Sequence, residues 1–262
     1  MQGSVTRIEL GSDRERRISV AVPVVFLACA IIGWWWSRRA GMDDGGAQGM
    51  SGTGSMAMTT MSLGAFVLAW VAMMAAMMLP AVIPVVRLYA LAAAKGRAAP
   101  TSFFTLGYLA VWSAMAAPAY VAWRALQEPL ADGRPWVARV AGATFLAAAV
   151  WQVTPLKAVC LRHCRSPLGF FMRFGSGIRS PLGALRMGAA HGGFCLGCCW
   201  AIFAVLVVLG TMNLAWMAAL TVLIVLEKNA PRGPQLATAA AVALAGLGTW
   251  LLLDPSILTH LT

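Results

Sequence analysis

The chain alternates between long apolar runs and short polar segments, and this pattern predicts membrane-spanning helices. A run of about 20 apolar residues, at about 1.5 Å per residue, crosses the roughly 30 Å hydrocarbon core of a bilayer. Spans are expected at 18–36, 63–89, 103–123, 137–155, 187–209, 214–226 and 236–253. The run 214–226 is short for a crossing. The predicted fold is therefore all-α, a polytopic transmembrane helical bundle of about seven spans (six to seven).

The polar segments set the expected organisation of the chain. Residues 1–17 form a polar N-terminal segment, 18–36 the first span, 37–62 a Gly/Met-rich exterior loop, 63–253 a six-span membrane domain and 254–262 a short exterior tail. The first run is longer than the apolar core of a signal peptide, and it ends in Trp34, Trp35 and Trp36 instead of small residues. It is therefore interpreted as a retained span.

Composition and charge agree with a membrane protein. Hydrophobic residues make up 60% of the chain and charged residues only 11%, and the mean hydropathy is +0.75. A net charge of +11 is also typical of nucleic-acid-binding proteins, but here the basic residues lie between the apolar runs, as topology determinants do. Most of them fall on the side that includes the N-terminus and 157–186. We therefore expect an integral membrane protein with a cytoplasmic N-terminus, in contact with lipid and not with nucleic acid.

A sulfur-rich run inside an apolar segment supplies the candidate chemistry. At helical spacing, one face carries Met187, His191, Cys195 and Cys199. Cys198 lies one turn from Cys195. Thiolates and thioethers suit Cu(I), whereas Mg, Ca or Mn would need carboxylates that these runs lack. The sequence predicts a Cu(I) site made of His191, Cys195, Cys198 and Cys199.

Two further groups extend this site into a path. Cys160 and Cys164 are four residues apart, at the expected cytoplasmic side, and form the pair through which metal would enter. A ladder of thioethers on the second span would act as transfer ligands: Met73, Met74, Met77 and Met78. Zinc stays open as the alternative metal for Cys160, Cys164 and His191.

Packing explains part of the same pattern. Methionine often fills gaps in helical cores, and cysteine behaves as a small apolar residue. Small residues in the run would let helices approach closely: Gly188, Gly192, Gly193 and Gly197. His191 is harder to explain by packing, because an ionisable side chain inside a bilayer is costly. Glu227 and Lys228 are interpreted as a helix end.

Separated motifs resemble a bacterial family described as predicted metal-binding integral membrane proteins. They are WVAMMAAMMLP at 70–80, PLKAVCLRHCRSP at 155–167, HGGFCLGCCW at 191–200, and MNLAWM at 212–217 with Glu227-Lys228. The resemblance covers about residues 63 to 232. It implies a multi-span bundle and a role in metal handling, since some members are regarded as copper chaperones that help load a cuproenzyme.

The predicted function is a copper-chaperone-like membrane protein, not an enzyme, that binds Cu(I) and delivers it to a membrane or exported cuproenzyme. A cuproenzyme or another metallochaperone is the expected partner, and homo-oligomerisation is left open. Two rivals remain. One is a transmembrane metal transporter with the methionine ladder as its pathway, and the other is a membrane thiol-disulfide oxidoreductase using Cys195 and Cys198. The second is disfavoured because two cysteines in one helix meet disulfide geometry poorly.

Overall fold

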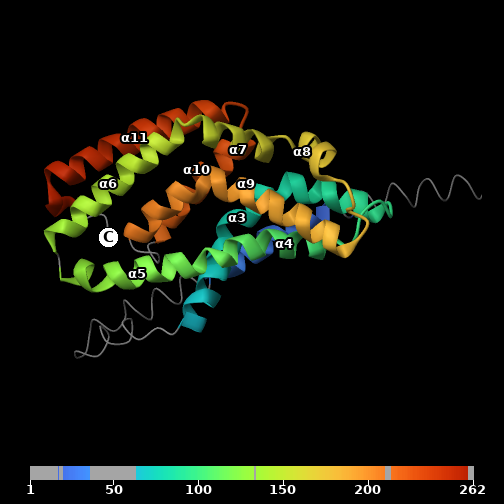
Figure 1. Cartoon of the computed structure of the whole chain (residues 1–262), viewed down its shortest axis with the longest axis horizontal. Coiled ribbons are helices and arrows are strands. Elements are labelled where there is room, and N and C mark those ends of the chain that lie inside the picture. The colour runs from blue at the N-terminus through green and yellow to red at the C-terminus, as the bar shows by residue number, and fades with distance from the viewer. Residues whose placement is uncertain (1–16, 18–19, 36–62, 133, 210–213, 259–262) are drawn as a thin grey trace, which may run out of the picture.

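The computed structural model describes residues 17, 20–35, 63–132, 134–209 and 214–258 (Figure 1). Within these residues the regular structure is helical and includes no strand. The predicted all-α fold is confirmed for this part of the chain. The Gly/Met-rich segment 37–62, nearly all of 1–17 and the end of 254–262 lie outside the described residues.

The described helices follow one another with short connections. In chain order they are Val20–Trp35, α3 (Leu63–Ala94), α4 (Thr101–Ala114), α5 (Ala116–Ala131), α6 (Pro135–Gln152), α7 (Pro155–Arg165), α8 (Pro167–Phe174), α9 (Pro181–Val208), α10 (Leu214–Asn229), α11 (Gly233–Leu253) and the 3-10 turn η2 (Pro255–Ile257).

Four segments in this part of the chain are long and apolar enough to cross a membrane. They are Phe66–Ala94 in α3, Thr101–Leu126 over α4 and α5, α9, and α11. The predicted spans 63–89, 103–123, 187–209 and 236–253 fall on them. A fifth crossing results if α6 and α7, which are bent by 64°, count as one span. The described residues therefore support four crossings, or up to five, and the predicted total of seven is not confirmed.

The difference from seven arises at broken or short segments. The predicted span 137–155 ends early, because α6 stops at Gln152 and Pro155 opens α7. Proline has no N–H to continue a preceding helix and is well suited to a first turn. The described part of α10 has 16 residues, which corresponds to about 24 Å, and the described part of the first predicted span, Val20–Trp35, is also below the length of a full span.

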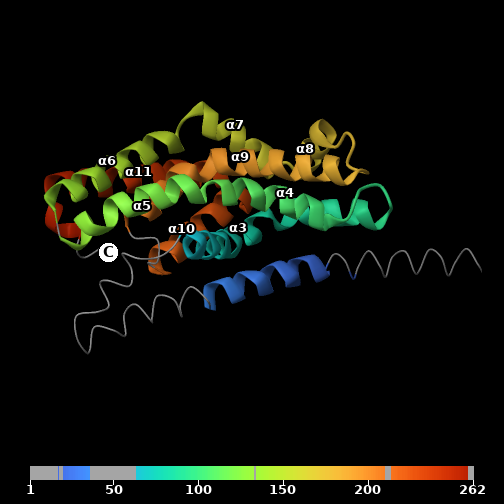
Figure 2. The ribbon, with the colours of Figure 1, turned by 60° about the horizontal axis from the view of Figure 1, so that its bottom comes forward.

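Helix α9 lies at the centre of the bundle. It packs against α4 and α7 and also contacts α6, α5 and α10, as the two views of the ribbon show (Figures 1 and 2). The contact with α4 is close because glycines face it: a Cβ on Gly188 would collide with the carbonyl of Phe104, and one on Gly192 would lie 3.0 Å from the carbonyl oxygen of Tyr108. The predicted glycine seam is thus confirmed at these two positions, and it brings α4 close to the sulfur-rich face.

The other helices complete two core clusters around α9. α3 packs against α4, α5, α8 and α10, while α6 and α11 pack along each other. The larger cluster contains the methionines of α3 and the buried cysteines, and the smaller one joins α6, the C-terminal half of α9 and α11. The helix Val20–Trp35 lies beside α3 (Figure 2), where Gly33 faces Ala76.

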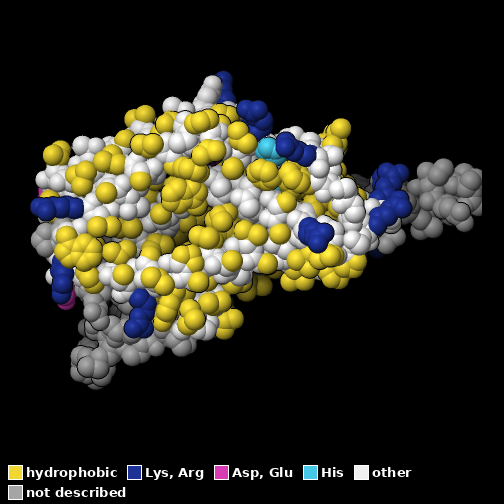
Figure 3. Space-filling view, in the orientation of Figure 1, with side chains coloured by type: hydrophobic (Ala, Val, Ile, Leu, Met, Phe, Trp, Pro, Cys, Tyr) yellow, Lys and Arg dark blue, Asp and Glu magenta, His cyan; other side chains and the backbone are white. Residues whose placement is uncertain are grey.

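Apolar side chains also cover much of the outer surface. Figure 3 shows hydrophobic residues over the visible face with only a few Lys and Arg side chains. Large apolar residues are well exposed on several helices, for example Leu68 on α3, Val242 on α11 and Met172 on α8. Exposed apolar surface on this scale is unusual for a soluble monomer and is compatible with insertion into a membrane.

Candidate metal centre

Four thiols from two helices converge in the larger core cluster. Cys195, Cys198 and Cys199 lie on α9 and Cys164 on α7, and all four are buried. The sulfur atoms of Cys198 and Cys199 are 3.3 Å apart, and Cys164 lies close enough to Cys195 and Cys198 to interact with their thiols. We call these four residues the thiol cluster. All of them were predicted as ligands, although from two separate groups.

The register between α7 and α9 explains why Cys164 reaches this cluster. Thr154 caps α7 by accepting a hydrogen bond from the N–H of Lys157, which fixes the start of the helix. The His163 ring stacks on Phe194 with 4.3 Å between centroids, and the indole of Trp151 donates to the carbonyl of Gly197 at 3.1 Å. The earlier residue, Trp151, therefore contacts the later position on α9, and the later residue, His163, contacts the earlier one. Segment 151–163 and α9 run antiparallel.

Lys228 of α10 enters the thiol cluster. Its ammonium donates a hydrogen bond to the sulfur of Cys195 at 2.8 Å, and the hydroxyl of Tyr108 lies 3.1 Å from the same sulfur. Lys228 also interacts electrostatically with the other three thiols. It is buried, with 6% of its side chain exposed. Sequence reasoning missed this residue, although an ionisable group next to an apolar run was a signal for it.

The carboxylate of Glu227 does not balance the charge of Lys228. Glu227 pairs with Lys157 at 2.6 Å and accepts a hydrogen bond from the amide of Gln152 at 2.9 Å. Lys157 also donates to the amide oxygen of Gln152. Within the described residues, Glu227 is the only buried carboxylate, against two buried lysines. Because buried charges need partners, a thiolate in the cluster is the group left to neutralise Lys228.

His191 lies one helical turn before Cys195 and is also buried, at 2% exposure. Its ring packs among Phe170, Tyr108 and Phe104, with centroid distances of 4.9, 5.9 and 6.1 Å. Its Nδ1 has no hydrogen-bond partner among the described residues. A buried ring nitrogen without a partner is costly. His191 thus offers a donor atom next to the thiol cluster, without a direct contact to a sulfur.

The remaining predicted ligands lie apart from the thiol cluster. The sulfur of Cys160 packs against Gly197, where an added Cβ would lie 2.7 Å from it, so Cys160 and Cys164 meet α9 at different points. The methionine ladder Met73, Met74, Met77 and Met78 is buried in the same core cluster. Its helix packs chiefly on α4 and α10, and the structure gives no direct contact between its sulfurs and the thiols.

The thiols are not preset in a metal-binding geometry. Among the described residues, no group of three or more His, Cys, Asp or Glu side chains is placed to hold a metal ion. The thiol of Cys198 instead donates to the carbonyl of Cys195 at 3.1 Å, and the sulfur of Cys195 contacts Lys228 and Tyr108. These side chains would have to turn toward a common centre to bind a soft cation. All six cysteines are free thiols.

The fold and the site define an all-helical, predominantly apolar protein with a buried centre of soft ligands. The family model described as PpoB2, copper chaperone, matches residues 67–251, and the chain belongs to this family. The resemblance seen in the sequence motifs is therefore confirmed, and the match includes every predicted ligand as well as Tyr108 and Lys228. No curated protein and no solved structure matched the chain.

Proposed function

We propose that this protein is an integral membrane copper chaperone that holds Cu(I) in the thiol cluster and passes it to a membrane or exported cuproenzyme. The observation that carries the proposal is the convergence of four buried thiols, Cys164, Cys195, Cys198 and Cys199, around the ammonium of Lys228. Membership of a copper-chaperone family supports the choice of metal. Sulfur donors prefer Cu(I) over harder cations.

Charge balance gives a simple account of how the cluster accepts the ion. Without metal, one thiolate and Lys228 neutralise each other. When Cu(I) arrives, a second thiol releases its proton, and two thiolates, one Cu(I) and one ammonium again sum to zero. Lys228 leaves the sulfur of Cys195 but stays beside the thiol cluster as the counter-charge. A buried site that is neutral in both states avoids the cost of an uncompensated charge.

The other predicted ligands are assigned to transfer. Cys160 lies on the same helix as Cys164 and would receive metal before the cluster does. His191, with its unpartnered Nδ1, is a fifth donor that can accompany the ion as the thiols exchange. Met73, Met74, Met77 and Met78 would carry Cu(I) onward as neutral thioethers, and support for this comes from their burial in the same core as the thiols. Zinc is the competing metal.

The membrane setting is part of the proposal. We assign about seven crossings in a bacterial inner membrane, counting Val20–Trp35, the α6–α7 pair and α10 with the four long segments, and a cytoplasmic N-terminus. Support comes from the four candidate spans, from the exposed apolar surface and from the distribution of basic residues. The predicted cytoplasmic side then includes α7 and α8.

Metal analysis tests the proposal. Protein purified anaerobically under reducing conditions is loaded with Cu(I), and copper and zinc are measured per chain. We expect about one tightly held copper, loss of it in the variant C195S/C198S/C199S, and retention in C29S, whose exposed cysteine lies on Val20–Trp35. No uptake of copper, preferential zinc, or full retention in the triple variant would reject the site. Copper accumulation in sealed vesicles would indicate a transporter.

A further inference from the structure

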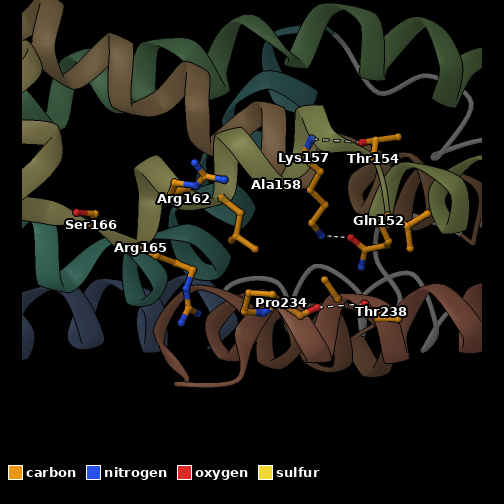
Figure 4. A pocket seen from close by; sticks show the side chains of 12 residues that line it. Gln152, Thr154, Lys157, Ala158, Arg162, Arg165, Ser166, Pro234 and Thr238 are labelled. Carbon is orange, nitrogen blue, oxygen red and sulfur yellow. Dashed lines mark hydrogen bonds between the residues drawn. The ribbon is translucent and has the colours of Figure 1, made fainter.

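A groove lies between α7, which also carries Cys160 and Cys164, and the first turns of α11. α11 packs along α6, but the 64° bend between α6 and α7 directs α7 away from it. The space that opens has a volume of about 510 Å³. Figure 4 shows α7 on one side of this groove and Pro234 and Thr238 of α11 on the other.

The groove is lined by cations without a matching carboxylate. Lys157, Arg162 and Arg165 contribute to its walls, and no Asp or Glu does. Lys157 is neutralised by Glu227 behind the wall. Arg165 donates to the backbone carbonyls of Glu227 at 2.6 Å and Pro231 at 3.3 Å, which leaves its positive charge uncompensated. Arg162 is exposed and forms no ion pair within the described residues. The groove therefore carries the charge of two guanidinium groups.

The rest of the lining is amphipathic. Hydroxyl groups come from Thr154, Ser166 and Thr238, and the apolar side chains in the lining include Val153 and Leu161. Arginine forms paired hydrogen bonds with phosphate oxygens and suits them better than a point charge does. A cavity of several hundred Å³ accepts a molecule much larger than a bare phosphate. The expected ligand thus joins an anionic phosphate to an apolar part.

The surroundings of the groove favour a lipid as the source of that phosphate. The neighbouring surface is apolar: Val153, Leu156 and Val159 are 61%, 63% and 45% exposed. α7 also lies in the most basic part of the chain, which the topology assigns to the cytoplasmic side. Basic pockets between helices on that side are typical binding sites for anionic lipid headgroups.

We infer that the groove between α7 and α11 binds the phosphate headgroup of an anionic phospholipid through Arg162 and Arg165. The inference rests on the membrane location in the proposed function, but not on copper binding. A bound lipid would join α7 to α11 beside the Lys157–Glu227 pair. Glu227 is followed directly by Lys228, so the headgroup would also hold in place the end of α10 that contacts the thiol cluster.

Native mass spectrometry of the full-length protein in detergent tests this assignment. Phosphatidylglycerol and phosphatidylcholine with the same acyl chains are offered in separate titrations. We expect preferential retention of phosphatidylglycerol and an affinity about fivefold lower in R162Q, the effect of one interfacial cation. The double variant R162Q/R165Q should lose the preference. The matched control is R179Q, because Arg179 is exposed in the same basic segment but does not line the groove.

Equal retention of the two lipids, or an unchanged preference in R162Q/R165Q, would overturn the inference. If inorganic phosphate binds alone and displaces phosphatidylglycerol, the groove is a site for a free anion. If an acidic peptide displaces the lipid, the groove is a site for a protein partner. Either result also overturns the assignment to a lipid headgroup. Copper content is measured in the same samples, and alkaline carbonate extraction of membranes tests the membrane location. Absence of copper would reject the metal site, release of the protein by carbonate would reject the membrane location, and absence of a lipid preference in the native protein would reject the lipid site. The three failures are therefore distinguishable.

Discussion

The ammonium of Lys228 lies 2.8 Å from the sulfur of Cys195, and both groups are buried in the centre of the bundle. A thiolate is the form of cysteine that binds metal, and a neighbouring cation favours it. Because Glu227 is engaged by Lys157, Lys228 depends on the thiol cluster for its counter-charge. This pair links the charge of α10 to the cysteine sulfurs of α9.

Replacing Lys228 with methionine is expected to weaken Cu(I) binding. The apolar side chain fits the same space but cannot neutralise the second thiolate, so the affinity should fall roughly tenfold or more, as expected for loss of a hydrogen bond to a charged group. Competition against a Cu(I) chelator measures this. K95M, at an exposed lysine after α3, serves as the control, and equal affinities for K228M and K95M would contradict the role of Lys228.

Cys164 and Cys160 are expected to differ although they lie one turn apart on α7. C164S removes a member of the thiol cluster, so the equilibrium affinity for Cu(I) should fall at least tenfold. C160S leaves the cluster intact, because the sulfur of Cys160 faces Gly197, and should mainly slow loading in stopped-flow experiments. A larger loss of affinity in C160S than in C164S would show that the register between α7 and α9 is wrong.

The buried Lys157–Glu227 pair is expected to stabilise the junction of α6, α7 and α10. E227Q leaves the ammonium of Lys157 without its counter-charge, and the free energy of unfolding should drop by about 3 kcal/mol. The double variant K157M/E227L removes both charges and should recover much of that loss. Chemical unfolding in detergent measures both. If the double variant is less stable than E227Q, the pair does not act as described.

Two glycines on α9 provide a matched test of the contact with α4. In G188A the new methyl group would collide with the carbonyl of Phe104, whereas at Gly193 no atom lies within 4 Å of an added Cβ. G188A should lower the melting temperature and the copper affinity together, because α4 carries Tyr108. G193A should be neutral or stabilise the helix by up to about 1 kcal/mol. The same melting temperature for both variants would argue against close packing at Gly188.

The helices and the α9 part of the site were predictable because they depend on local spacing. Apolar runs identified α3, α9 and α11, and the i, i+3 and i+4 spacing placed Cys195, Cys198 and Cys199 near one another. The joining of Cys164 to this group, and the separation of Cys160 from it, depends on the register between α7 and α9. That register is fixed by long-range contacts such as Trp151 with Gly197, which the sequence pattern does not contain.

Lys228 shows a second limit of the sequence pattern. A Glu-Lys pair at the end of an apolar run is typical of a helix end at the membrane surface, and burial distinguishes this from a functional pair. Burial results here from α10 packing against α3, α7, α9 and α11. Pro155 marks the break between α6 and α7 in the sequence. The groove beside α7 could not be predicted in the same way, because its other wall is the start of α11.

X-ray absorption at the copper edge tests the central claim most directly. Full-length protein is loaded anaerobically with one equivalent of Cu(I), and the spectrum is compared with that of C195S/C198S/C199S and of C29S. We expect a monovalent ion whose nearest neighbours are mainly sulfur in the native protein and in C29S, with that signal lost in the triple variant. Neighbours that are mainly nitrogen or oxygen, or a sulfur signal that persists in the triple variant, would contradict it.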